Sequence, residues 1–181
     1  MNALLLTAGG LDRLVRRVGQ LAAWLSLALM AVIVFDVVTR RFWVIGSTKL
    51  QDLEWHLHAA LFLTTLGYAY VEGAHVRIDI LHARFGPKTA AAVELLGALL
   101  LLAPFCLVVL WYGASFVERS FLMGEGSASQ TGLPHRFVVK SFLLIGFGLL
   151  LLAAVAAALR SLATLLGAPP PVREIHTEVG P

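Results

Sequence analysis

Four stretches of the chain are predominantly apolar, and each is long enough to cross a lipid bilayer. A membrane-spanning helix needs about 20 mainly apolar residues. The pattern predicts four such helices, over residues 18–38, 53–71, 89–117 and 137–159. The third is longer than a hydrocarbon core of about 30 Å requires, so we expect it to tilt or bend. The predicted fold class is therefore all-α and integral to a membrane.

The two ends of the chain differ from these stretches. Residues 1–17 alternate leucine and valine with three arginines, which predicts a short amphipathic lead-in on the membrane surface. The first apolar patch is too short, and the later apolar run too long, for a cleavable signal peptide. Residues 166–181 are polar and rich in proline, a composition typical of disorder. We expect an amphipathic segment 1–17, a membrane domain 18–165 and a disordered tail 166–181.

Composition excludes two broad classes of protein. Of the 181 residues, 59% are hydrophobic and 14% are charged, and the mean hydropathy is +0.83. These values are unlike those of a water-soluble domain or a disordered chain. The net charge is +3, but the basic residues flank apolar segments, so they indicate anionic lipid rather than nucleic acid.

The distribution of basic residues gives an orientation. Four crossings place both termini on one side of the membrane, with eight of the 14 Lys and Arg residues on that side and six on the other. Since cytoplasmic loops carry an excess of Lys and Arg, this favours cytoplasmic termini.

Polar residues near the membrane are the candidates for function. Asp36 lies near the end of the first predicted crossing, and Arg40 follows one helical turn later. Two opposite charges at this spacing can neutralise each other. A carboxylate that takes part in transport is the alternative, although Asp36 does not lie at midspan.

A second candidate is a polar face at the start of the second predicted crossing. Gln51, Glu54, His58 and Thr65 recur at helical spacing. A charged side chain in a bilayer costs about 2.5–3.5 kcal/mol, so such a face usually meets protein or water. It could contact a partner helix, form a proton or ligand site, or be hydrated among the lipid headgroups.

Two further features are structural candidates. In the stretch 73–80, His75 and Asp79 belong to an alternation of polar and apolar residues, which fits an extended segment on the membrane surface. A short amphipathic helix over 76–85 is the alternative. Pro104 lies inside the third crossing, where its missing N–H predicts a kink.

Few residues could support a cofactor or a catalytic reaction. His56 or His58 could face His135 across a haem, but all three lie at the rim of the bundle. A zinc site of His75, Asp79 and His82 requires that stretch to be helical. Cys106 stands alone in an apolar run. No nucleophile elbow, P-loop or HExxH motif is present, so we expect no cofactor and no enzymatic activity.

The chain resembles the small membrane subunit of tripartite ATP-independent periplasmic (TRAP) transporters, the DctQ-like family, over roughly residues 15–165. The resemblance depends on four helices in a chain of 181 residues, on several residues in and after the second helix, and on two later segments, Gly124 to Ser127 and Gly132 to Pro134. The residues are Glu54, Leu66, Gly67, Gly73, His75, Val76, Ile78 and Asp79.

The resemblance implies a function without a catalytic residue. Members pair with a large permease subunit that carries the sodium and substrate sites, while a periplasmic solute-binding protein delivers an organic acid or related solute. The small subunit is similar to a fixed scaffold in the bacterial inner membrane that supports the large subunit and helps to dock the binding protein. Two alternatives are a haem-binding, cytochrome-b-like anchor and a small homodimeric exporter.

Overall fold

The computed structural model describes residues 2–43, 46–73 and 86–169, and all the regular secondary structure in these ranges is helical. The α-helices are α1 (Asn2–Ala23), α2 (Leu25–Phe42), α3 (Thr48–Val71), α5 (Pro87–Leu96), α6 (Ala103–Leu122) and α7 (Phe137–Leu165). A π-helical segment, η1 (Gly97–Leu102), joins α5 to α6. Apolar stretches with few charges form helices because a helix satisfies its own backbone groups.

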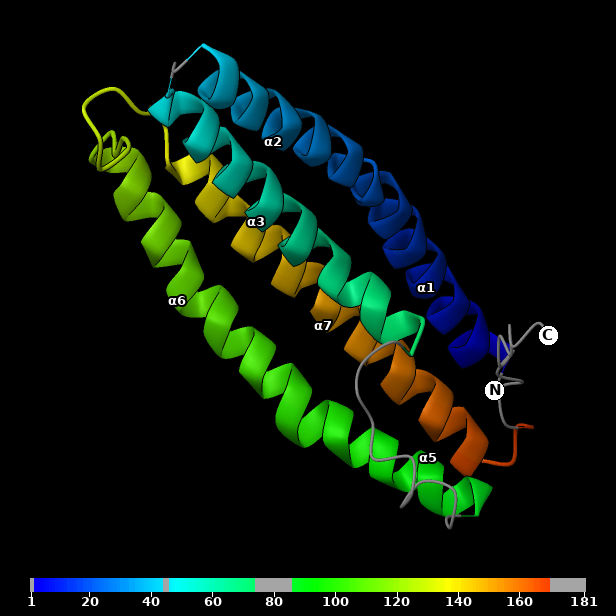
Figure 1. The fold of residues 1–181 in the computed structure, drawn as a ribbon. Helices are drawn as coiled ribbons and strands as arrows, with labels where there is room; N and C mark the ends of the chain where they lie inside the picture. The colour runs from blue at the N-terminus through cyan, green and yellow to red at the C-terminus, as the bar shows by residue number, and fades with distance from the viewer. Residues whose placement is uncertain (1, 44–45, 74–85, 170–181) are drawn as a thin grey trace, which may run out of the picture.

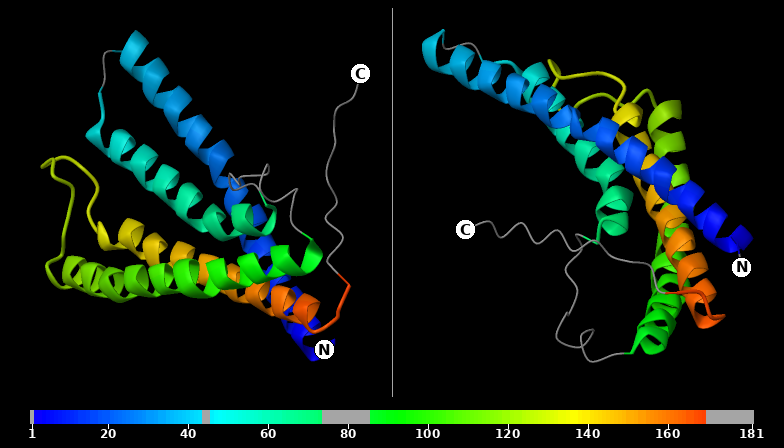
Figure 2. Two further views of the ribbon diagram at one scale, coloured as in Figure 1. Left: turned by 90° about the horizontal axis from the view of Figure 1, so that it is seen from below. Right: turned by 90° about the vertical axis from the view of Figure 1, so that its right-hand side faces the viewer.

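The helices form an antiparallel bundle around α7 (Figure 1). The start of α1, the end of α3, the start of α5 and the end of α7 lie at one end of the bundle. The end of α2, the start of α3 and the loop from α6 to α7 lie at the other (Figure 2). Both ends of the described chain therefore share one end of the bundle, as four alternating segments require.

Helix α7 lies at the centre of the bundle because its side chains are small where the neighbouring helices approach it. Its buried positions include Gly146 and six alanines, whereas α2 buries only Asp36. Leu149 and Ala153 of α7 pack with Val15 of α1. Small residues let helix backbones come close, which is the usual source of packing energy in lipid.

The first predicted crossing is part of a longer unit. No helix boundary falls at residue 18: α1 continues to Ala23, and Trp24, whose φ and ψ are helical, joins it to α2. The two helices form a span of 41 residues, about 60 Å at 1.5 Å per residue. The residues of the predicted amphipathic lead-in pack against α3 and α7, burying Ala8 and Val15.

Ion pairs hold α1 to its neighbours at the end of the bundle near the N-terminus. Arg160 of α7 binds Asp12, and Arg16 binds Glu72 at the end of α3. Each pair joins residues that are far apart in sequence. One of the three arginines of α1, Arg16, therefore binds another helix of the chain.

Three spans in the described ranges are long and apolar enough to cross a membrane: Asn2–Phe42, Pro87–Leu122 and Phe137–Leu165. Helix α3, with 24 residues, has the length but not the composition, because polar residues crowd its first half. The predicted count of four crossings is thus not confirmed, although α3 lies beside α7 within the bundle.

The third predicted crossing contains the irregularity expected of its proline. The N–H of Ala103 bonds to the carbonyl of Ala98, five residues back, so the π-helical turn ends directly before Pro104. Proline cannot donate to the preceding turn, and a widened turn accommodates its ring. Helix α5, η1 and α6 together curve along the bundle (Figure 1).

Helix α7 extends beyond the predicted residue 159 and ends in a Schellman motif. Gly167 has a positive φ of 101°. The N–H of Ala168 donates to the carbonyl of Ala163 at 2.9 Å, and the N–H of Gly167 donates to the carbonyl of Thr164 at 3.1 Å. Glycine adopts this backbone conformation at little cost. The predicted disordered tail lies outside the described residues after residue 169.

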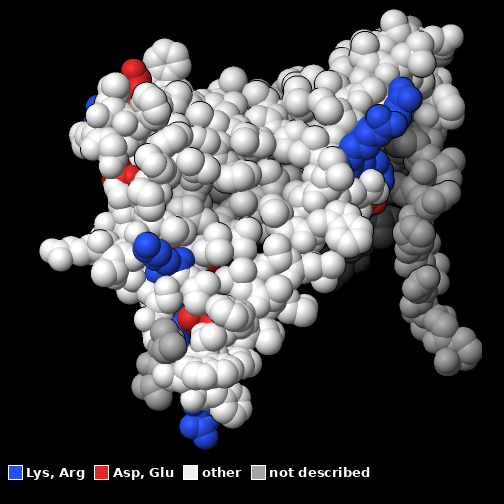
Figure 3. All heavy atoms as spheres, turned by 90° about the horizontal axis from the view of Figure 1, so that it is seen from above, with Lys and Arg blue, Asp and Glu red and all other residues white. Residues whose placement is uncertain are grey.

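Charged atoms occupy few places on the outside of the bundle. The face shown in Figure 3 is mostly uncharged, with Lys, Arg, Asp and Glu in small separate patches. Large apolar side chains are exposed instead, such as Phe35 at 58%, Leu101 at 73% and Trp111 at 77%. Such a surface requires lipid or another apolar protein surface around it.

Candidate functional site

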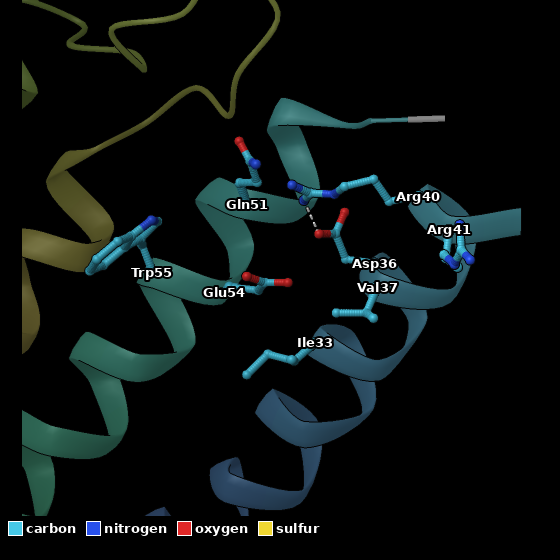
Figure 4. Close-up of a pocket in the computed structure, with 8 residues that line it drawn as sticks. All are labelled: Ile33, Asp36, Val37, Arg40, Arg41, Gln51, Glu54 and Trp55. Carbon is cyan, nitrogen blue, oxygen red and sulfur yellow. Dashed lines mark hydrogen bonds and ion pairs between the residues drawn. The ribbon is translucent and has the colours of Figure 1, made fainter. Parts of the chain in front are cut away.

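A cleft between α2 and α3 gathers four of the polar residues that the sequence singled out: Asp36, Arg40, Gln51 and Glu54. It has a volume of about 660 Å³ and lies where the end of α2 meets the start of α3 (Figure 4). Its lining residues are Ile33, Asp36, Val37, Arg40, Arg41, Gln51, Glu54 and Trp55.

The predicted pairing of Asp36 with Arg40 is present. Arg40 donates a hydrogen bond to Oδ2 of Asp36, and the spacing of four residues brings the two side chains together on one face of α2. The Asp36 side chain is only 4% exposed and that of Arg40 is 47% exposed. Oδ1 of Asp36 is buried and has no hydrogen-bond partner among the described residues.

Gln51 of α3 also binds Arg40. With the amide oriented as its surroundings require, the side-chain oxygen of Gln51 accepts hydrogen bonds from both terminal nitrogens of Arg40, each at 3.1 Å. The guanidinium therefore bridges α2 and α3, and its donors are directed at Asp36 and Gln51 (Figure 4).

Glu54 differs from Asp36 in its surroundings. Its carboxylate points from α3 toward α2 (Figure 4) and is partly exposed. Within the ranges that the structure describes, it forms no hydrogen bond or ion pair. The cleft thus contains one carboxylate that is paired and one that is not.

The predicted polar face of this helix is shorter than its spacing suggested. Gln51 and Glu54 line the cleft, but His58 is exposed outside it. Thr65 bonds to the carbonyl of Leu61 in its own helix at 2.8 Å. Only the first turns of α3 therefore present polar groups to the cleft.

Gly67 has a role in packing. A Cβ built on Gly67 would lie 2.9 Å from the backbone of Leu149 in α7, and one built on Gly146 would lie 2.7 Å from the carbonyl carbon of Leu63 in α3. Two glycines on facing helices therefore bring α3 and α7 close together. Other glycines of these membrane segments have no such contact: a Cβ on Gly97 or Gly148 would meet nothing within 4 Å.

His75 and Asp79 lie outside the described residues, as do the predicted extended segment and the zinc alternative that involves His82. The described ranges contain no group of three His, Cys, Asp or Glu side chains placed to hold a metal ion. His135 lies in the loop before α7, with its ring 5.9 Å from the ring of Phe137.

Sequence reasoning missed the anchoring of the loop between α6 and α7. Asp52 of α3 accepts a hydrogen bond from the N–H of Leu133 at 2.8 Å, and Thr48 bonds to Thr131 at 2.6 Å. A Cβ on Gly132 would collide with Asp52. The loop is rich in Gly and Ser, a composition typical of flexible segments, but hydrogen bonds hold this one on the start of α3.

Glu125 secures the other end of the same loop. Its carboxylate accepts from Lys140 of α7, and its backbone carbonyl accepts from the N–H of Arg136 at 2.8 Å. The Lys140 hydrogen bond lowers the pKa of Glu125 below its ordinary value. The loop is therefore connected to α7 as well as to α3.

Fold and site together define a helical membrane protein with an apolar exterior and a polar cleft at one end. Comparison with models of protein families matches residues 29–164 to the tripartite ATP-independent periplasmic transporters, DctQ component. The match covers most of the chain, from α2 through α7, so the chain belongs to this family, the small permease component of TRAP transporters. This is a transporter component and not an enzyme family. A comparison with curated proteins finds no match.

Proposed function

We propose that this chain is the fixed subunit that supports a large permease subunit during sodium-coupled uptake of an organic acid or related solute. A periplasmic solute-binding protein would deliver that solute. Membership of the DctQ family is the observation that carries the proposal. Uptake would take place in the large subunit, and this chain would hold it in the bilayer.

The distribution of exposed apolar side chains supports a role for this chain as a scaffold. Helix α2 buries only Asp36 inside the chain, while Leu27, Met30 and Val34 are more than half exposed. Helix α6 likewise exposes Phe105 and Trp111. A chain that leaves α2 so open can bind a second membrane protein along that helix without rearranging its own core, while lipid can cover the exposed side chains of α6.

The proposed orientation places four crossings in the inner membrane, with both termini in the cytoplasm. The antiparallel order of the helices and the excess of basic residues on the terminal side support it. The cleft and the anchored loop would then lie at the periplasmic end, where the solute-binding protein arrives.

Co-purification tests the proposal. The chain carries an affinity tag and is co-expressed with the large permease subunit of its own transporter, and a tagged unrelated four-helix membrane protein serves as the control. We expect the large subunit to elute in a fixed ratio with this chain and not with the control. Elution of this chain without the large subunit, in a detergent that keeps both folded, would contradict the proposal.

A further inference from the structure

One of the two carboxylates in the α2–α3 cleft has no ion-pair partner among the described residues. Arg40 directs its donors to Asp36 and Gln51, which leaves Glu54 without a counter-ion among the described residues. Arg41 projects away from Glu54 (Figure 4). Although Arg41 also lines the cleft, no cation of the described residues therefore forms an ion pair with Glu54.

Asp36 gives a second, independent indication. Its side chain is 4% exposed, yet Oδ1 has no hydrogen-bond partner among the described residues. A buried carboxylate oxygen normally accepts a hydrogen bond, since leaving it without one costs free energy. Each of the two helices thus has a carboxylate oxygen without a hydrogen-bond partner among the described residues.

We propose that Glu54 receives the side chain of a lysine or arginine from a helix of the large permease subunit. This inference rests on the proposed function and names the contact at this cleft. A volume of about 660 Å³ accommodates such a side chain, and its apolar stem would lie along Ile33 and Val37. An unpaired carboxylate at the membrane is costly, and a cation from the partner removes that cost.

Removing the charge of Glu54 tests the contact. The substitution Glu54→Gln keeps the shape of the side chain, and Glu118→Gln, at an exposed acid of α6 outside the cleft, is the matched control. In the co-expressed two-subunit complex, we expect Glu54→Gln to weaken retention of the large subunit about tenfold, or 1.4 kcal/mol. Glu118→Gln should retain it as the wild type does.

A charge reversal gives a second readout. Glu54→Lys should abolish uptake by the whole transporter, and selection for restored uptake should return changes from a basic to an acidic residue in the large subunit. Suppressors that leave every Lys and Arg of the large subunit unchanged would overturn the inference.

The outcomes separate this inference from the proposed function. If the wild-type chain retains the large subunit and Glu54→Gln retains it equally well, only the contact is refuted. If Glu54→Gln lowers the melting temperature of the isolated chain, the partner of Glu54 lies within this chain and the inference is also wrong. If even the wild-type chain fails to retain the large subunit, the proposed function fails.

Discussion

Replacement of Gly146 by alanine should separate α3 from α7. The new Cβ would lie 2.7 Å from the carbonyl carbon of Leu63, whereas ordinary contact begins at 3.4 Å. The two backbones would have to move apart by about 0.7 Å or more. Neither backbone can rotate out of the way as a side chain could. Overpacking of this kind costs about 1–3 kcal/mol.

Gly148 supplies the matched control on the same helix. A Cβ on Gly148 would meet nothing within 4 Å, and glycine is disfavoured inside a helix relative to alanine by about 0.5–1 kcal/mol. Gly148→Ala should therefore leave stability unchanged or raise it slightly.

Thermal unfolding of the purified chain in detergent, followed by tryptophan fluorescence, measures both variants. A change of 1 kcal/mol corresponds to about 2–4 °C for a chain of this size, so we expect Gly146→Ala to melt several degrees lower. Equal melting temperatures for Gly146→Ala and Gly148→Ala would refute the close approach of α3 and α7.

Three further perturbations address the polar contacts. Arg40→Ala leaves Asp36 buried without its cation and should cost about 2 kcal/mol in thermal unfolding, less than in a fully buried pair because Arg40 is half exposed; the double variant with Asp36→Ala should recover much of it. Asp52→Ala removes the acceptor that holds the α6–α7 loop, so limited proteolysis should cleave that loop faster, and an unchanged rate would contradict the anchoring. Because Lys140 lowers the pKa of Glu125, their contact is fully present above the ordinary pKa of a glutamate and is lost as the pH falls through the lowered value. Protection of the loop amides from hydrogen exchange, relative to the intrinsic exchange rate at each pH, should therefore persist at neutral pH and be lost only at a pH below the ordinary pKa of a glutamate, and Glu125→Gln should remove that pH dependence.

The sequence was sufficient for the features that depend on local pattern. Apolar length located the helices, and the four-residue spacing of Asp36 and Arg40 predicted their ion pair. Pro104 marked the irregular turn because a missing N–H acts on its own helix. Each of these features needs only residues within one or two helical turns.

Features that depend on distant contacts could not be read in the same way. Gly146 and Gly148 look alike in the sequence, and only the position of α3 shows which of them touches another backbone. Asp52 and Leu133 are 81 residues apart, so a composition typical of flexibility concealed an anchored loop. The break at Trp24 also lacked a proline or glycine to mark it.

Helix α3 shows where composition and position give different answers. Its polar first half keeps it outside the spans selected by apolar content, yet it contacts α1, α2 and α7. Gln51 and Glu54 line the cleft, and Thr48 and Asp52 bind the loop. Polar residues of membrane proteins usually face protein or water in this way.

The most direct test of the account is solute uptake by reconstituted vesicles. Proteoliposomes would contain this chain alone, the large permease subunit alone, or both, with the solute-binding protein outside and an inward sodium gradient. The account predicts uptake only when both subunits are present. Robust sodium-driven uptake by vesicles that contain this chain alone would contradict it.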